Sequence, residues 1–415
     1  MAKKKTFSII SLGCFRNTYD SEIIAARLKA QGYQLEAEAD NLDLLLINTC
    51  GFIRDAKQEA VDVLKDAVAL KEEGRIKKLA VVGCLVQRYQ DELKRHFPQV
   101  DIWQGVEPLS PLALPRQKIM PAWLDFLKIA EGCSHCCSYC AIPMIKGPLF
   151  SKPVNAILEE VKRLDDSGVK ELNIIGQDIT AWGQDRYKKK NLAFLLKKIA
   201  ANCSSIRWIR LLYTHPDNFS DELIDVIASQ PNICKYIDLP VQHINDRILK
   251  LMNRRISKKE ILKLIEKLRA RIPGCVIRTS LIAGFPTETE AEFRELLDFL
   301  SLVKFDKAGA FAYSREEGTA AAGLKPQVHH RTIASRLKRL MALQQDISLE
   351  ANSRFVGQDL EVLAEEKEDD VYICRNAYNC YDVDGVVYVK RKKMKPGEFY
   401  KVKITDALEY DLVGK

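Results

Sequence analysis

The chain has 415 residues, 47% of them hydrophobic and 29% charged, which is enough for two or three domains with apolar cores of their own. It carries a net charge of +8, contains no uncharged apolar run long enough to cross a membrane, and shows no signal-peptide pattern after its basic start, so we expect neither a membrane protein nor an exported one. Its twelve cysteines therefore predict a cytoplasmic protein with metal or redox chemistry instead of disulfides.

The first hundred residues alternate short apolar runs with helical patterns. We predict strands in FSIISLG, LLLINTC and KLAVVGC, with helices at about 20–30 and 53–70 and a short helix after residue 87. Such alternation is typical of a parallel sheet covered on both faces. The pattern predicts an N-terminal open parallel α/β domain at residues 1–105. Residues 106–122, with four prolines, indicate a linker.

Three cysteines stand where these predicted strands end. Cys14, Cys50 and Cys84 each adjoin a glycine, in LGC, CGF and VGC. The carboxyl ends of parallel strands meet at one edge of the sheet, where such folds bind ligands, so we expect the three side chains to lie together. Three buried free thiols are the alternative, because cysteine is often buried. The repeated position beside glycine, which allows close backbone approach, favours a three-cysteine cluster site.

The densest group of cysteines lies in EGCSHCCSYCAIP, residues 131–143. Its glycine, serine and proline residues discourage regular structure, so we predict a loop. Cys133, Cys137 and Cys140 have the spacing C-x3-C-x2-C. A four-iron cluster needs one ligand per iron, so three cysteines leave one iron free to bind a small molecule. The loop therefore predicts a reaction centre and not an electron carrier.

Cys136 leaves the ligand set open, because Cys133, Cys136 and Cys140 fit the reversed spacing C-x2-C-x3-C. The first order places Tyr139 directly before the last cysteine, as radical S-adenosylmethionine enzymes do, and the stretch resembles that superfamily. Zinc is an alternative, with His135 or Cys136 as a further ligand, although no second pair lies at zinc-finger spacing. A disulfide scaffold is the weakest interpretation, since two of the cysteines are adjacent.

Repeated β/α units follow the cysteine loop. The predicted strands are ELNIIGQ, WIRLLYT, YIDLPVQ, CVIRTSLIAG and AGAFAYS, and the predicted helices lie near 153–167, 191–201, 220–229, 245–271 and 290–302. Such repetition over about two hundred residues predicts a partial or full (β/α) barrel, with function at the carboxyl ends of its strands. We place this central domain at 123–330.

Polar residues cluster at those strand ends, namely Gln177, Asp178, Tyr213, Thr214, His215, Gln242, His243 and Glu288. A lone histidine is more often structural than catalytic, so we expect this group to line a substrate or cofactor site without transferring protons. Glu288 ends GFPTE, which is either a simple turn or a contact to adenosylmethionine. No phosphate-binding GxxxxGK[ST] or strand-linked GxGxxG occurs, so nucleotide binding has no support.

The last part of the chain changes character. A basic amphipathic pattern at 330–353 predicts a helix, which we place at 331–353 as the connection to the tail. Short strand patterns and the turn Asp384-Gly385 then predict a small all-β barrel or sandwich at 354–415. From Phe355 onward ten Lys/Arg stand against thirteen Asp/Glu, so the tail is acidic, with EEKEDD at 365–370 and KRKKMK at 390–395.

These three parts, in this order, resemble the radical S-adenosylmethionine methylthiotransferases, which combine a cluster domain, a radical domain and a TRAM domain. The matching stretches are SLGCFRNTYDSE, INTCGFIRDAKQEA, GCLVQRY, KIAEGC with CAIPMIKGPLFSKP, RLLYTHP, YIDLPVQHINDRILKLMNRR, AGFPTETE, AYSREEGTAAA and the ending YDLVGK. Arg16 and Lys146 exchange the basic residue expected at each place, and Cys136 replaces a polar or basic one. Arg and Lys keep the charge but differ in hydrogen-bond geometry.

The resemblance implies two [4Fe-4S] clusters and S-adenosylmethionine as cofactors. Cys14, Cys50 and Cys84 would bind an auxiliary cluster, and Cys133, Cys137 and Cys140 the cluster that binds adenosylmethionine. We assign Tyr139, Gln177 and Glu288 to the same cofactor site. A radical formed from adenosylmethionine would take hydrogen from an unactivated carbon of the substrate, sulfur would be added at the auxiliary cluster, and a second adenosylmethionine would supply the methyl group.

Within this family, the sequence of these stretches is similar to that of the branch that methylthiolates the β-carbon of an aspartate in ribosomal protein S-twelve of the small subunit. The alternative is the branch that modifies an adenosine in transfer RNA, whose RNA contacts require a basic surface. The acidic tail suits docking on a basic ribosomal protein, although KRKKMK keeps direct nucleic-acid binding open. A non-enzymatic ribosome- or RNA-binding protein stabilised by clusters is a third interpretation. An enzyme would also need an external electron donor.

Overall fold

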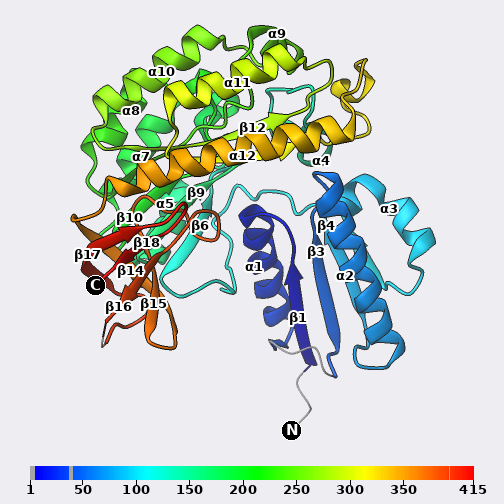
Figure 1. Ribbon diagram of the computed structural model, residues 1–415. Helices are drawn as coiled ribbons and strands as arrows, with labels where there is room; N and C mark the ends of the chain where they lie inside the picture. Colours follow the sequence, from blue (N-terminus) through cyan, green and yellow to red (C-terminus); the bar gives the residue numbers. More distant parts are fainter. Residues whose placement is uncertain (1–4, 37–40, 392) are drawn as a thin grey trace.

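The computed structural model describes residues 5–36, 41–391 and 393–415 (Figure 1). The first residues of the basic start and Lys392 of the basic run at 390–395 lie outside the described residues. Three units follow one another along the chain: a blue α/β unit, a central green unit with a parallel sheet, and a small orange and red β-barrel at the C-terminus. The predicted fold class is confirmed.

The N-terminal sheet is parallel and has the strand order β2-β1-β3-β4-β5. Its strands are β1 (Lys5–Ser11), β2 (Tyr33–Leu35), β3 (Leu44–Thr49), β4 (Leu79–Gly83) and β5 (Ile102–Gln104), and its helices are α1 (Phe15–Ala30), α2 (Arg54–Glu72) and α3 (Cys84–His96). β3 and β4 are buried throughout, as expected of strands covered on both faces.

Two helix starts were predicted too late. α1 begins at Phe15, five residues before the predicted start, and α3 begins at Cys84 and not after Gln87. In both places the chain passes from strand to helix within a few residues, with Gly13 and Gly83 at positive φ. The turns are tight because glycine adopts this conformation without a steric penalty. Cys14 and Cys84 therefore lie at the first turns of helices.

The central sheet is open, so the barrel is partial. Its six parallel strands have the order β13-β12-β11-β10-β9-β6. They are β6 (Leu124–Lys128), β9 (Glu171–Ile175), β10 (Trp208–Leu211), β11 (Ile233–Asp238), β12 (Val276–Ala283) and β13 (Lys307–Ala312). The helices are α5 (Val154–Asp166), α6 (Gln184–Tyr187), α7 (Leu192–Ala201), α8 (Asp221–Ser229), α9 (Asp246–Leu251), α10 (Lys258–Arg271) and α11 (Glu290–Val303).

Small elements that sequence analysis missed frame the cysteine loop. β7 (Ala130–Glu131) pairs antiparallel with β8 (Phe150–Ser151), and α4 (Ile142–Lys146) lies between them. The segment from residue 132 to 141 has neither helix nor strand, which confirms the predicted loop. The loop is thus tied at its base by a two-stranded sheet and does not depend on sulfur ligation alone for its path.

The C-terminal unit follows α12 (His330–Ser353), which packs along α11 and β13 and crosses the molecule in Figure 1. It is a closed barrel of β14 (Asp359–Glu368), β15 (Val371–Asn376), β16 (Val387–Lys390), β18 (Leu412–Gly414) and β17 (Phe399–Ala407). The barrel alternative is therefore right and the sandwich alternative wrong. Within the described part of the chain, no helix combines the length and apolar character needed to cross a bilayer.

A buried ionic cluster joins the barrel to the central sheet. Glu171, fully buried on β9, accepts hydrogen bonds from Arg210 Nε at 2.9 Å and from Arg375 Nη2 at 2.6 Å. Removing one member of such a group leaves an uncompensated buried charge, at a cost of roughly 3–5 kcal/mol. These contacts link the small barrel to the central sheet and help to fix their relative position.

Candidate functional site

The three cysteines at the strand ends of the N-terminal sheet converge. A Cβ atom at Gly13 would lie 2.9 Å from Cys50 Sγ, and one at Gly51 would lie 2.7 Å from the backbone of Leu85, next to Cys84. Asn17 holds the turn together, since its Nδ2 donates to the carbonyl oxygens of Leu12 and Thr49 at 3.0 and 3.1 Å. Glycine is required at these positions because backbone and sulfur approach too closely for any side chain.

The sulfurs of this first trio differ in acidity. Burial raises the pKa of Cys14, but Arg16, whose Nε donates to Cys14 Sγ at 3.4 Å, outweighs it, so the pKa lies below its usual value. Burial raises the pKa of Cys50, and it raises that of Cys84 to about 12. Cys14 therefore has the most stabilised thiolate, whereas the other two must lose protons when a metal centre binds.

The second trio lies on the loop between β7 and α4. The Cys133 N–H donates to the carbonyl oxygen of Gly147 at 3.1 Å, and the Cys140 N–H donates to that of Cys137 at 3.0 Å. Burial raises the pKa of Cys133 to about 11 and that of Cys140 to about 12, and the charge of Cys137 acts on both. The three cysteines are thus partly buried and near enough for their charges to act on one another.

Cys136 differs from the other cysteines of this loop, although its charge also acts on Cys133. It is exposed and has a φ of 53°, in the left-handed region, and its carbonyl oxygen accepts a hydrogen bond from Asn253 Nδ2 at 2.8 Å. Tyr139 instead packs inward beside a cluster that contains Met252 and Phe285, where burial raises its pKa. The geometry favours Cys133, Cys137 and Cys140 as the set that shares one centre.

The two trios face each other across the domain boundary. Cys84 of the first packs in one small apolar cluster with Ala141, which directly follows Cys140 of the second, and with Ile145. Arg16 bridges the same boundary, because its Nη1 donates to the carbonyl oxygen of Gly176 at the end of β9, at 3.1 Å. Two separately encoded cysteine groups are therefore brought side by side.

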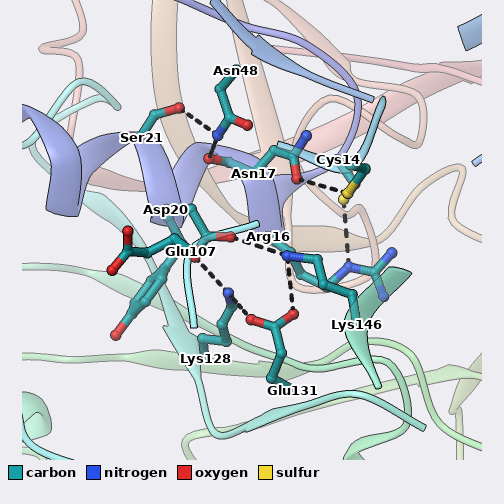
Figure 2. A network of polar contacts seen from close by, with 12 residues as sticks. Cys14, Arg16, Asn17, Asp20, Ser21, Asn48, Glu107, Lys128, Glu131 and Lys146 are labelled. Atoms are coloured by element: carbon teal, nitrogen blue, oxygen red, sulfur yellow. Dashed lines mark hydrogen bonds and ion pairs between the residues drawn. The ribbon is translucent and has the colours of Figure 1, made fainter. Parts of the chain in front are cut away.

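A buried network of charges sets this juxtaposition (Figure 2). Lys128, fully buried on β6, lies 2.5 Å from both Asp20 of α1 and Glu131 of β7. Lys146 of α4 lies 3.3 Å from the same two carboxylates, and Gln177 Nε2 donates to Glu131 at 2.8 Å. α1 starts after Cys14 and β7 precedes Cys133, so the network ties one cysteine loop to the other.

The carboxylates of this network are not equivalent. Burial raises the pKa of Glu131, but Lys128 and Lys146 outweigh it and lower that pKa to about 2, whereas burial dominates at Asp20 and raises its pKa. Two ammonium groups shared between two buried carboxylates form a closed, nearly neutral set. Its members are therefore structural, although in the sequence they look like ordinary surface charges.

A strap at residues 314–321 also touches both loops. Glu316, 2% exposed, pairs with Lys57 of α2 at 2.7 Å and with Arg88 of α3 at 2.8 Å. Further along, the Ala321 N–H donates to the carbonyl oxygen of Ser138 in the second loop at 2.8 Å. Glu316 ties the central domain to the N-terminal one, and the local sequence AYSREEGTAAA gave no sign of this role.

Two predicted residues at the strand ends are engaged inside the protein. The Glu288 carboxylate accepts from the Gly284 N–H at 2.7 Å and from Arg336 Nη1 at 2.7 Å, and lies 3.1 Å from His243 Nε2. His243 is itself fully buried and so does not line an open site. Glu288 holds the GFPTE turn in place; whether it also contacts a cofactor stays a prediction. Gln177, by contrast, keeps a buried Oε1 without a partner.

A polar pocket of about 260 Å³ lies beside Cys133 and was not predicted. His135 Nε2 lies 2.6 Å from Asp178 Oδ2, and the rings of His135 and His215 stack 3.9 Å apart at an interplanar angle of 11°. Burial lowers the pKa of His215 to about 4. His135, His215 and Asp217 bring donor atoms within 4.8 Å, but parallel stacked rings do not aim two nitrogen lone pairs at one ion, so a zinc site is not favoured.

The cysteine trios fit a different inorganic group. Each offers three sulfur donors from partly or fully buried positions, and the only additional cysteine of the second loop is turned to solvent. Around the first trio, a Cβ atom at Gly13 or Gly51 would clash with the neighbouring cysteine or backbone, so glycine lets the three strand ends approach one another. These features suit a four-iron cluster held by three thiolates, with one iron left for another ligand.

Comparisons with known proteins agree with this geometry. Residues 6–105 match the uncharacterized protein family UPF0004, residues 127–300 match the radical SAM superfamily, and residues 356–415 match the TRAM domain. The chain is 42% identical to the ribosomal protein uS12 methylthiotransferase RimO of Desulforamulus reducens, over 99% of each chain. The corresponding protein of Phocaeicola vulgatus is 44% identical, also over 99% of each chain.

Solved structures share the fold at low sequence identity. The radical S-adenosylmethionine methyltransferase TsrM from Kitasatospora setae aligns with a TM-score of 0.56 and 11% identity, covering 88% of this chain and 79% of that one. The cobalamin-dependent S-adenosylmethionine radical enzyme OxsB aligns with a TM-score of 0.53 and 11% identity, covering 83% and 56%. These likenesses concern the fold alone.

Proposed function

Since the chain belongs to the RimO family of radical SAM methylthiotransferases, we propose that it adds a methylthio group to the β-carbon of an aspartate in ribosomal protein uS12. The observation that carries this proposal is the face-to-face position of the two cysteine trios, joined by the contact of Cys84 with Ala141. Removal of hydrogen from a carbon and delivery of sulfur to that carbon need two adjacent centres. One cluster alone would serve a simpler reaction.

The residues present fit the cofactors in named roles. Cys133, Cys137 and Cys140 would hold the cluster that binds adenosylmethionine. The auxiliary cluster would be held by Cys14, Cys50 and Cys84. Bound there, these groups supply one-electron chemistry and a radical able to take hydrogen from an unactivated carbon.

The protein itself would position the two cofactor-binding loops and keep water away from the reacting groups. The four-membered network of Asp20, Lys128, Glu131 and Lys146 keeps the two loops in register, and the strap around Glu316 closes a second side. We propose that Tyr139 of the second loop and Gln177, which follows β9, contact the cofactor. A site enclosed in this way excludes water from a reactive radical.

The partner surface is proposed on the small barrel. The end of β14 and the turn to β15 expose four acidic residues, Glu366, Glu368, Asp369 and Asp370, which suits a basic ribosomal protein by complementary charge. Val371 pairs with Lys390, so the basic run begins at the same end of the barrel, and docking depends on the acidic turn itself. An external electron donor completes the reaction, and a ribosomal substrate agrees with the cytoplasmic location expected from the cysteine content.

Mass spectrometry of a deletion strain tests the substrate. We expect uS12 from cells that lack this protein to lose its methylthio group, while transfer RNA keeps its modifications, and we expect a plasmid copy to restore uS12. If the strain instead lost a methylthio group from adenosine in transfer RNA, the transfer RNA branch would be correct. If neither changed, and the purified protein released no 5′-deoxyadenosine under reducing conditions, the non-enzymatic alternative would stand.

A further inference from the structure

Arg16 is a cation of the site that forms no ion pair with a described Asp or Glu residue, although the charge of Glu131 acts on it. Its neighbours Lys128 and Lys146 are each within 3.3 Å of two carboxylates. Among the described residues, no Asp or Glu oxygen lies within ion-pair distance of Arg16, whose contacts are the sulfur of Cys14, the carbonyl of Gly176 and the ring of Tyr213. Buried cations are usually paired with anions, and the described residues give Arg16 a cysteine sulfur but no carboxylate at ion-pair distance.

The guanidinium has hydrogen-bonding capacity left over. Nε donates to Cys14 Sγ and Nη1 donates once to Gly176, while Nη2 has no hydrogen bond to any described residue. The planar group lies 4.6 Å over the Tyr213 ring, which fixes its plane. A guanidinium offers five donors in a rigid fork, so at least two remain for a ligand.

The group also lies between the two cysteine trios. The charge of Arg16 acts on Cys14, Cys50 and Cys84 of the first trio and on Cys140 of the second. Figure 2 shows Arg16 directly below Cys14, with the closed network of Lys128 and Lys146 on its other side. A carboxylate bound to Arg16 would therefore carry its neighbouring carbon into the space between the two centres.

We propose that Arg16 receives the side-chain carboxylate of the target aspartate. The inference rests on the proposed function and names the residue that recognises its substrate. The carboxylate is the only charged part of an aspartate side chain, and its two oxygens match the guanidinium fork. The reacting β-carbon is bonded directly to that carboxylate. Binding of the carboxylate by Arg16 would therefore also position the β-carbon. An adenine base carries no such charge, which makes Arg16 a means of discriminating protein from RNA.

The competing explanation is that Arg16 only positions Cys14. In that case its loss would release the auxiliary cluster and would leave any preference for aspartate over asparagine untouched. A measurement of uS12 binding, which needs no turnover, therefore distinguishes the two explanations when the iron content of the same protein samples is also determined.

The experiment measures binding of uS12 to the cluster-loaded protein by anaerobic calorimetry without a reductant. The probes are wild-type uS12 and uS12 whose target aspartate is replaced by asparagine. We expect the wild-type enzyme to bind the aspartate form about 30-fold more tightly, as for a desolvated charge pair. Arg16→Gln should bind both forms equally with its iron content unchanged, and Arg16→Lys, which keeps the charge without the fork, should retain part of the preference.

Lys29→Gln is the matched control, since it removes a positive charge from the exposed end of the same helix. It should bind both probes as the wild-type enzyme does. An undiminished aspartate preference in Arg16→Gln would overturn the inference while leaving the proposed function intact. Loss of about half the iron in both Arg16 variants would assign the residue to cluster retention and would also overturn it. Failure of the wild-type enzyme to bind uS12 at all would overturn the inference and the proposed function together.

Discussion

Replacing Cys133, Cys137 or Cys140 by alanine is expected to reduce the release of 5′-deoxyadenosine to the background of the reductant alone. Each of these cysteines is one of three ligands around a shared space on the loop after β7, and two thiolates do not retain a four-iron cluster. Without the cluster, adenosylmethionine has neither its iron ligand nor its source of an electron. The measurement is chromatography of anaerobic reactions with dithionite, run with equal amounts of each variant.

Cys136→Ala is the control within the same loop. The side chain is exposed and the backbone is held by Asn253, so the substitution should leave 5′-deoxyadenosine release close to wild type. An inactive Cys136→Ala together with an active Cys137→Ala would show that the reversed spacing is the correct one. That outcome would require the loop to reorganise, because Cys136 now has a left-handed backbone turned to solvent.

Replacing Cys14, Cys50 or Cys84 by alanine should separate the two halves of the reaction. These sulfurs form the other trio, so adenosylmethionine cleavage should continue while methylthiolation of uS12 falls below detection. The physical reason is that the radical centre keeps its three ligands, whereas the centre that delivers sulfur loses one of its own. The measurement is the ratio of 5′-deoxyadenosine to methylthiolated uS12 in the same reaction.

Cys203→Ala is a suitable control for this series. Cys203 is a free, partly buried cysteine of the central domain, next to α7 and away from both loops, and it should support both half-reactions. If any variant of the first trio still methylthiolated uS12, the auxiliary cluster would not be the sulfur centre. If all three also lost adenosylmethionine cleavage, the trios would depend on one another structurally and the division of labour would be wrong.

Much of the fold could be predicted from the sequence because parallel β/α units leave a strong local signal. Strands buried on both faces, such as β3 and β4, are predominantly apolar runs, and helices between them have the matching period. The convergence of Cys14, Cys50 and Cys84 followed from the same logic, since each ends a strand of one parallel sheet. Short edge strands such as β2, with only three residues, gave no comparable signal.

The connections between domains could not be predicted. Lys128 and Glu316 look like ordinary charged residues in the sequence, yet they are 0% and 2% exposed because their partners come from distant segments. The pairing of Arg16 with Gly176 spans 160 residues. A local sequence pattern carries no information about such contacts. The sequence therefore indicated which residues could bind a metal cluster or cofactor, but not which contacts hold those residues in place.

The central claim is that the chain holds two four-iron clusters, each on three cysteines with one iron left open. Iron and sulfide analysis with Mössbauer spectroscopy of anaerobically reconstituted protein tests it most directly. We expect about eight irons per chain, falling to about four when either trio is replaced, with one spectroscopically distinct iron in each cluster. A plateau near four irons in the wild-type protein, full ligation of either cluster by side chains, or a single tightly held zinc ion would contradict it.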